Sequence, residues 1–171
     1  YLYKTSNVNI IANNINNQTQ NVYIRLCSNI NFNNNILNTK YQCVYIIDSD
    51  FINFSNNSIN YNVDAKGYKM LQFYKVNKCN VISNIINGIS TNYQSYKTNV
   101  YFLRCNNIIL QSNNIYTDDD VEKWITNIFV SSFNNDFLIA NNIIKSNLKY
   151  RNVFYIKEKD NTSIKLLENI Y

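Results

Sequence analysis

Three charged residues recur at similar spacing along the chain and are the first candidates for chemistry. Asp48, Lys75 and Arg104 are 27 and 29 residues apart, and Asp50 stands two positions after Asp48. A fold that repeats over this distance would bring them together. Acid–base catalysis could follow, and Asp48 with Asp50 could form the carboxylate pair of a glycoside hydrolase. Arginine is a poor base because it stays protonated, so a ladder of ion pairs is the alternative for the same residues.

Aromatic and acidic residues gather in three segments, 60–69, 87–98 and 116–126. The candidate binding residues in them are Tyr61, Tyr68, Tyr93, Tyr96, Tyr116, Trp124, Asp118, Asp119 and Asp120. Aromatic rings offer flat apolar area for the faces of sugars, and carboxylates accept hydrogen bonds from hydroxyl groups. These residues indicate a glycan-binding surface, although the same rings could pack the segments onto the fold. An acidic run can bind a cation but is more often a solvated turn, so we predict no metal and no cofactor.

Composition restricts the chemistry further. The 171 residues include 37 Asn, two Gly, no Pro and no His. Without His, a Ser-His-Asp or Cys-His site is excluded, as are zinc and haem sites that use His. The formal charge of +5 comes from scattered Lys and Arg residues, so we expect no nucleic-acid partner. No apolar stretch approaches the length of a membrane span.

A repeated pattern defines the elements that must position these residues. One pattern recurs in seven copies 22 to 29 residues apart: an apolar residue, one spacer, a second apolar residue, two spacers, Asn, one spacer and a third apolar residue. Their asparagines are Asn13, Asn35, Asn57, Asn84, Asn113, Asn142 and Asn169. A second alternating segment precedes every copy but the first, beginning at Val22, Val44, Leu71, Val100, Ile128 and Val153. Period-two alternation is typical of strands, so we predict an all-β fold with three short strands per copy and one domain over residues 1–171.

The repeated Asn has a physical role in this scheme. A sharp bend between two strands needs a residue at positive φ, which Asn tolerates better than most residues. Its amide can also bond to the equivalent amide of the next copy. We therefore predict that the seven asparagines occupy the bend itself and form a ladder along the stack.

Two further patterns concern the surface and the thiols. The outward positions of the first strand in each copy are almost all aromatic: Tyr23, Tyr45, Gln72, Tyr101, Phe129 and Phe154. Such a column could stack on itself or be covered by the long segments, another subunit or a glycan.

Cys27 and Cys105 fall three copies apart, about 14 Å by strand spacing, too far for a disulfide. We expect all four cysteines to be free thiols, as in a protein folded in a reducing compartment.

The repeat resembles the right-handed parallel β-helix of the pectate-lyase-like superfamily, which has three strands per coil and an Asn ladder at its short second turn. The resemblance covers the whole chain and implies a solenoid of about seven coils. The superfamily includes polysaccharide lyases and hydrolases, phage tailspikes and fibres, and surface adhesins. Its catalytic groove commonly lies along the first strand, which is where Asp48, Lys75 and Arg104 end up. The polygalacturonase pattern of several Asp and one His is absent.

The resemblance implies two alternative functions. The incomplete catalytic set favours a non-catalytic module of an extended surface appendage, a phage tail fibre or spike or a cell-surface adhesin, that presents loops to a surface glycan or receptor. The alternative is a polysaccharide lyase or glycoside hydrolase of the same fold. Either implies a virion, extracellular or cell-surface location and no membrane partner. The first residue is Tyr1 and a copy closes on Tyr171, so we expect a fragment of a longer chain or a homo-oligomer.

Overall fold

A computed structural model describes residues 1–17, 22–39, 43–63, 69–90, 97–119, 125–131, 135–146, 151–157 and 163–171. Regular structure in these ranges is entirely β-strand, and every pair of neighbouring strands is parallel. The predicted all-β class is confirmed. Within the described ranges there is no helix long and apolar enough to cross a membrane.

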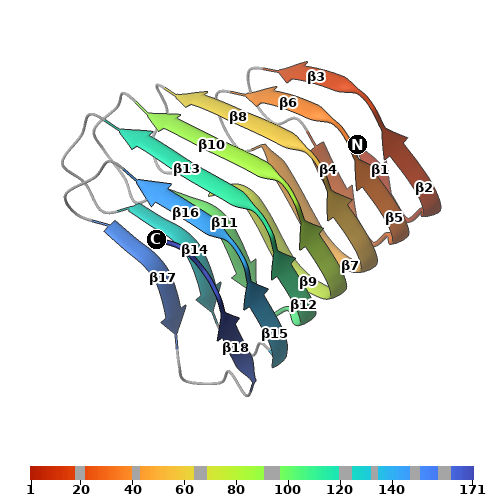
Figure 1. Cartoon of the computed structure of the whole chain (residues 1–171). Helices are drawn as coiled ribbons and strands as arrows, with labels where there is room; N and C mark the ends of the chain where they lie inside the picture. Colours follow the sequence, from red (N-terminus) through yellow and green to blue (C-terminus); the bar gives the residue numbers. More distant parts are fainter. Residues whose placement is uncertain are drawn as a thin grey trace.

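The strands form three ribbons in which each strand pairs with its equivalents in the neighbouring copies (Figure 1). The first ribbon contains β1 (Leu2–Tyr3), β4 (Val22–Arg25), β7 (Val44–Ser55), β9 (Lys69–Ile82), β11 (Lys97–Leu103), β14 (Ile125–Ser131) and β17 (Arg151–Lys157). The second contains β2 (Ser6–Ile11), β5 (Ser28–Asn33), the ends of β7 and β9, β12 (Asn106–Gln111), β15 (Asn135–Ala140) and β18 (Ile164–Leu167). Because β7 and β9 run through both, the two ribbons form one twelve-stranded sheet.

The third ribbon is a separate six-stranded sheet. It contains β3 (Asn14–Asn17), β6 (Ile36–Thr39), β8 (Ser58–Val63), β10 (Ile85–Ser90), β13 (Asn114–Asp119) and β16 (Ile143–Ser146). The predicted three strands are therefore present in the first six copies, whereas the third position of the last copy is a single bridge between Ile143 and Ile170. The first copy also has its leading strand, because Leu2 of β1 pairs with Ile24, so the prediction that this strand is missing there is wrong.

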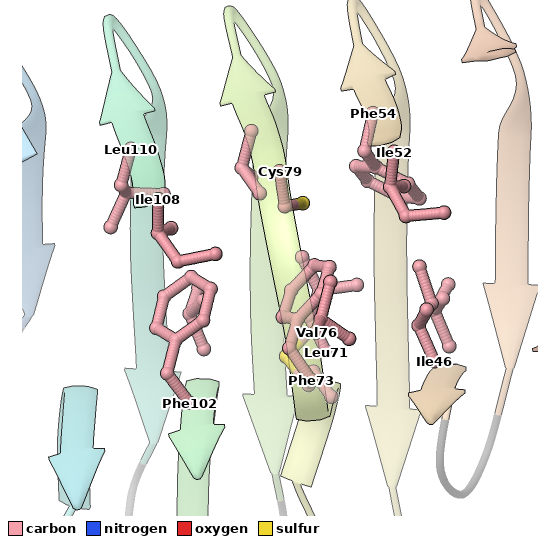
Figure 2. Packing of buried hydrophobic residues seen from close by; sticks show 14 of the residues in the cluster. Ile46, Ile52, Phe54, Leu71, Phe73, Val76, Cys79, Phe102, Ile108 and Leu110 are labelled. Atoms are coloured by element: carbon pink, nitrogen blue, oxygen red, sulfur yellow. The ribbon is translucent and has the colours of Figure 1, made fainter. Parts of the chain in front are cut away.

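The core lies between the ribbons and consists of the inward apolar columns (Figure 2). Buried aromatic rings run through it from copy to copy. Phe32 and Phe54 are stacked at 5.1 Å between centroids, and Phe73 and Phe102 at 4.9 Å. Phe54 meets Phe73 edge-on at 6.4 Å, which links the second ribbon to the first. Each copy therefore buries its apolar face against its neighbours and not alone.

The asparagine ladder is present through all seven copies. The backbone N–H and Nδ2 of each ladder residue both donate to Oδ1 of the next one, from Asn13 to Asn169, over 2.9–3.1 Å. Nδ2 also donates backwards to a main-chain carbonyl, such as Phe54 O for Asn84 and Val81 O for Asn113. The inner amides are thus paired on both their oxygen and nitrogen, which makes their burial tolerable.

The bend is made by a different residue from the one predicted. The ladder asparagines have ordinary backbone angles, and the residue before each has φ between 48° and 58°: Ala12, Asn34, Asn56, Ser83, Ser112, Asn141 and Glu168. The left-handed residue turns the chain, and the following Asn is then aimed inward with its N–H toward the next copy. Positive φ and ladder bonding are divided between two neighbours, so the prediction that one Asn does both is wrong.

Register in the last copy also differs from the prediction. Phe154 pairs with Ile128 and Ile156 with Val130, so the inward positions of β17 are 154 and 156. Tyr155 pairs with Phe129 and continues the outward column in place of Phe154. Phe154 packs against the core instead. A shift of one residue exchanges the two faces of a strand.

Candidate functional site

The outward side of the first ribbon carries the most regular array of partly exposed aromatic residues among those described. Tyr23, Tyr45, Gln72 and Tyr101 are in register on β4, β7, β9 and β11. Tyr1 stacks on Tyr23 at 5.0 Å, and Tyr45 meets Tyr23 edge-on at 5.4 Å. We call the outward surface formed by Tyr1, Tyr23, Tyr45, Gln72, Tyr101 and Tyr155 the tyrosine face.

Cations border this face. Lys69 places Nζ 3.6 Å from the Tyr101 ring centroid, and Lys75 Nζ lies 5.2 Å from that of Tyr74. Arg25 is exposed next to Tyr23 on β4. Rings bordered by cations provide both stacking area and charge-assisted hydrogen bonds to an anionic or hydroxylated ligand.

Partial burial changes the ionisation of the face. It raises the pKa of the Tyr45 phenol, helped by Tyr23, Tyr74 and Asp48, and it raises the pKa of Tyr101. These hydroxyl groups stay neutral and serve as hydrogen-bond donors and acceptors. Burial also lowers the pKa of the Lys69 amine, since the charged form loses hydration.

The four catalytic candidates lie at the corner between the first and second ribbons. Asp48, Lys75 and Arg104 occupy one column of left-handed residues, with φ of 48°, 52° and 56°. Lys75 Nζ lies 3.8 Å from Asp48 Oδ1, which is the ion pair that the alternative predicted. Asp50 is exposed in register with Ser28 and Asn77. The structure thus brings Asp48 and Lys75 together, and the catalytic role of the four stays a prediction.

The same corner explains the position of the thiols. Cys27 N–H donates to Ser49 Oγ in the next copy, and Ser49 pairs with Val76 in the copy after that. Asn77, which follows Val76, pairs with Asn106 of the next copy, and Asn106 directly follows Cys105. Cys27 and Cys105 are therefore three copies apart, as predicted. All four cysteines are buried and none is in a disulfide.

The predicted glycan-binding loops are described only in part. Tyr61 belongs to β8, and Tyr116, Asp118 and Asp119 to β13, so strands extend into segments that we predicted as loops. Tyr116 is partly exposed on the third ribbon, in register with Asn87 and Lys145, away from the tyrosine face. The other residues predicted for this surface lie outside the described residues: Tyr68, Tyr93, Tyr96, Asp120 and Trp124. Their binding role stays a prediction.

A buried polar cluster was missed by the sequence analysis. Asn99 Nδ2 donates to Thr117 Oγ1 and Asn127 Oδ1, both at 2.7 Å, and Thr117 Oγ1 donates to Asn127 Oδ1 at 2.8 Å. Asn99 is in register with Met70, between the pairs Thr98–Lys69 and Val100–Leu71. Its signal is a polar residue directly before an inward strand position, repeated at Asn127 before Ile128. The cluster fixes β11, β13 and β14 to one another.

Among the described residues, no three His, Cys, Asp or Glu side chains gather as they would around a metal ion. Comparison with known proteins returned no matching family model, no matching curated protein and no matching solved structure.

Proposed function

We propose that the chain is a right-handed parallel β-helix of the pectate-lyase-like type, a solenoid of about seven coils. The proposal is supported by parallel pairing between every copy and the next, by three ribbons around one core, and by the asparagine ladder after the second strand of each copy. Stacked repeats of this kind provide a long rigid surface.

We further propose that the module is a non-catalytic part of an extended surface appendage and binds a surface glycan or receptor. The observation that carries this proposal is the tyrosine face, where Tyr1 stacks on Tyr23, Tyr45 meets Tyr23 edge-on, and Lys69, Lys75 and Arg25 border the rings. Aromatic rings on a rigid ribbon give contact area at low cost in conformational entropy. The appendage is a tail fibre or tailspike of a virion or an adhesin of a cell surface, working as a homo-oligomer or within a longer chain, without a nucleic-acid or membrane partner.

One observation favours the enzymatic alternative, a polysaccharide lyase or glycoside hydrolase. Lys69 lies against Tyr101 with a lowered pKa, and an amine with a lowered pKa is more often in the neutral form that can accept a proton. A lyase would use such a base to remove a proton from a uronate sugar.

A glycan array tests the binding proposal. We expect the Tyr23→Ala, Tyr45→Ala double variant to lose about tenfold or more in affinity for the glycan that the parent binds, because ring anchors dominate such contacts. Ile85→Ala, an exposed residue of the third ribbon, is the matched control and should bind like the parent. Melting temperatures of all variants separate lost binding from lost folding.

Two further measurements distinguish the alternatives. Trp124→Ala tests the loops: if it alone abolishes binding, the loops are the binding surface and the tyrosine face is not. Release of reducing ends or unsaturated products from acidic and neutral polysaccharides, lost in Lys69→Met, would favour the enzyme. A parent that binds no glycan and releases no product would refute the glycan-binding and the enzymatic function.

A further inference from the structure

Asn87 and Gly88 form the only Asn–Gly pair in the chain, although 37 residues are Asn. This pair carries intrinsic chemistry. The backbone nitrogen of Gly88 can attack Cγ of Asn87 and expel ammonia, which closes a five-membered succinimide. Water then opens the ring to Asp or to isoaspartate. Gly favours the attack because it has no side chain to block the nitrogen.

Both residues of the pair are there for structural reasons. A Cβ at position 88 would lie 3.0 Å from Asn99 Oδ1 and 3.3 Å from Met70 Sδ, so any larger residue would require these two side chains to shift. Asn87 ends an outer amide ladder on the third ribbon: its Nδ2 donates to Asn60 Oδ1 at 3.0 Å, Asn60 donates to Asn38, and Asn38 to Asn16. Packing and ladder together place a reactive pair inside a strand.

The native strand opposes the reaction. β10 is paired on both sides, with β8 and β13, and Gly88 is buried. Attack requires the Gly88 nitrogen to leave this arrangement and turn toward Asn87 Cγ, while the Asn87 amide leaves Asn60. Backbone angles of an extended strand keep the two atoms from meeting.

We propose that Asn87 is the deamidation site of this protein and that local opening of β10 controls the modification. Neither product restores all the native contacts. An Asp at position 87 has no Nδ2 to donate to Asn60, and isoaspartate carries the main chain through Cβ and Cγ. The added main-chain atom spoils the register of β10 with both neighbours.

Peptide mass spectrometry of the 171-residue chain tests this proposal, by following the one-dalton mass gain at each Asn during incubation at 37 °C and neutral pH. In buffer we expect Asn87 to gain mass before any other described Asn, and at a rate about tenfold or more below its rate in unfolding urea. The rate should also rise with urea below the unfolding midpoint. Asn38 and Asn60 share the outer ladder but precede Thr39 and Tyr61, so they are internal controls and should remain amides.

Asn87→Gln is the matched variant, because it keeps the amide while disfavouring the five-membered ring, and it should abolish the mass gain at this position. Equal rates at Asn87 in buffer and in urea would overturn control by β10 opening. Earlier reaction at any other described Asn would overturn the assignment of the site. The proposal is independent of glycan binding, which Asn87→Gln should leave unchanged.

Discussion

At the scale of single residues, burial decides which groups can ionise. Cys79 and Cys105 are enclosed by the core, and burial raises the pKa of Cys79 well above its usual value and that of Cys105 to about 12. Both thiols stay protonated in the native protein and react poorly as nucleophiles. They act as small apolar side chains, and Cys79 lies between Ile52 and Ile108 in one inward column.

The thiols make stability sensitive to alkaline pH. Their unfolded-state pKa is near 9.0 and their folded pKa is higher, so the unfolded chain loses these protons first. The contribution of the two protonated thiols to the free energy of unfolding is fully present below about pH 9. It falls as pH rises above that value, by up to about 1.4 kcal/mol per pH unit for each thiol. Urea unfolding of the parent and of Cys79→Val at pH 8 and pH 10 should show a smaller loss in the variant. Equal losses would mean that Cys79 is ionised or accessible in the native state.

At the scale of elements, the corners depend on left-handed residues that are mostly not Gly. The corner after the first ribbon has two such columns, one with Leu26, Asp48 and Lys75 and the other with Asn29, Phe51 and Lys78, and the ladder corner has a third. A left-handed residue with a side chain costs about 1–2 kcal/mol. Tight turns and the parallel pairing on both sides hold these residues in place.

Gly at such a corner should therefore stabilise the fold. Ser83 is exposed at φ 56°. Ser83→Gly removes the strain caused by the Cβ atom but raises the conformational entropy of the unfolded chain. The net gain should be about 0.5–1 kcal/mol, measured by chemical denaturation. Asn56→Gly in the same column is the control and should gain less, because Asn tolerates the left-handed region. Destabilisation by Ser83→Gly would show that its side chain makes a contact worth more than the strain.

At the scale of the whole molecule, the asparagine ladder ties each copy to the next. An inner member such as Asn84 both accepts from Asn57 and donates to Asn113, whereas Asn13 is exposed and accepts from no described residue before it. An inner ladder Asn therefore makes more hydrogen bonds, and contributes more to stability, than the Asn at the end of the stack.

Substitution along the ladder should follow this gradient. Asn84→Leu or Asn113→Leu leaves buried donors and acceptors without partners, so each should destabilise by about 1–3 kcal/mol. Asn13→Leu at the exposed position should change stability by less than about 0.5 kcal/mol. Thermal and urea unfolding measure the differences. Inner variants that melt like the parent would refute the energetic role of the ladder.

Much of the architecture can be predicted from the amino-acid sequence alone. Period-two alternation and the regular Asn positions determine the three strands per copy, the inward columns and the ladder, because burial on one face of a strand leaves a linear pattern. The ion pair between Asp48 and Lys75 follows from the same spacing. Of the candidate site, the column of Tyr23, Tyr45 and Tyr101 was visible in advance for this reason.

Only the tertiary structure decides what depends on contacts between copies. In the last copy Val153 precedes Ile164 by 11 residues, against 8 or 9 between the equivalent residues of the other copies. The alternation alone therefore assigned Val153 to the inward face, whereas pairing with β14 places Phe154 there. Lys69 reaches Tyr101, and Asn99 reaches Asn127, across strands that are about 30 residues apart in sequence. The residue that takes positive φ is likewise chosen by the chain geometry at the corner and not by its type. Register, cross-strand partners and bend positions are set by packing between neighbouring copies, which no single copy encodes alone.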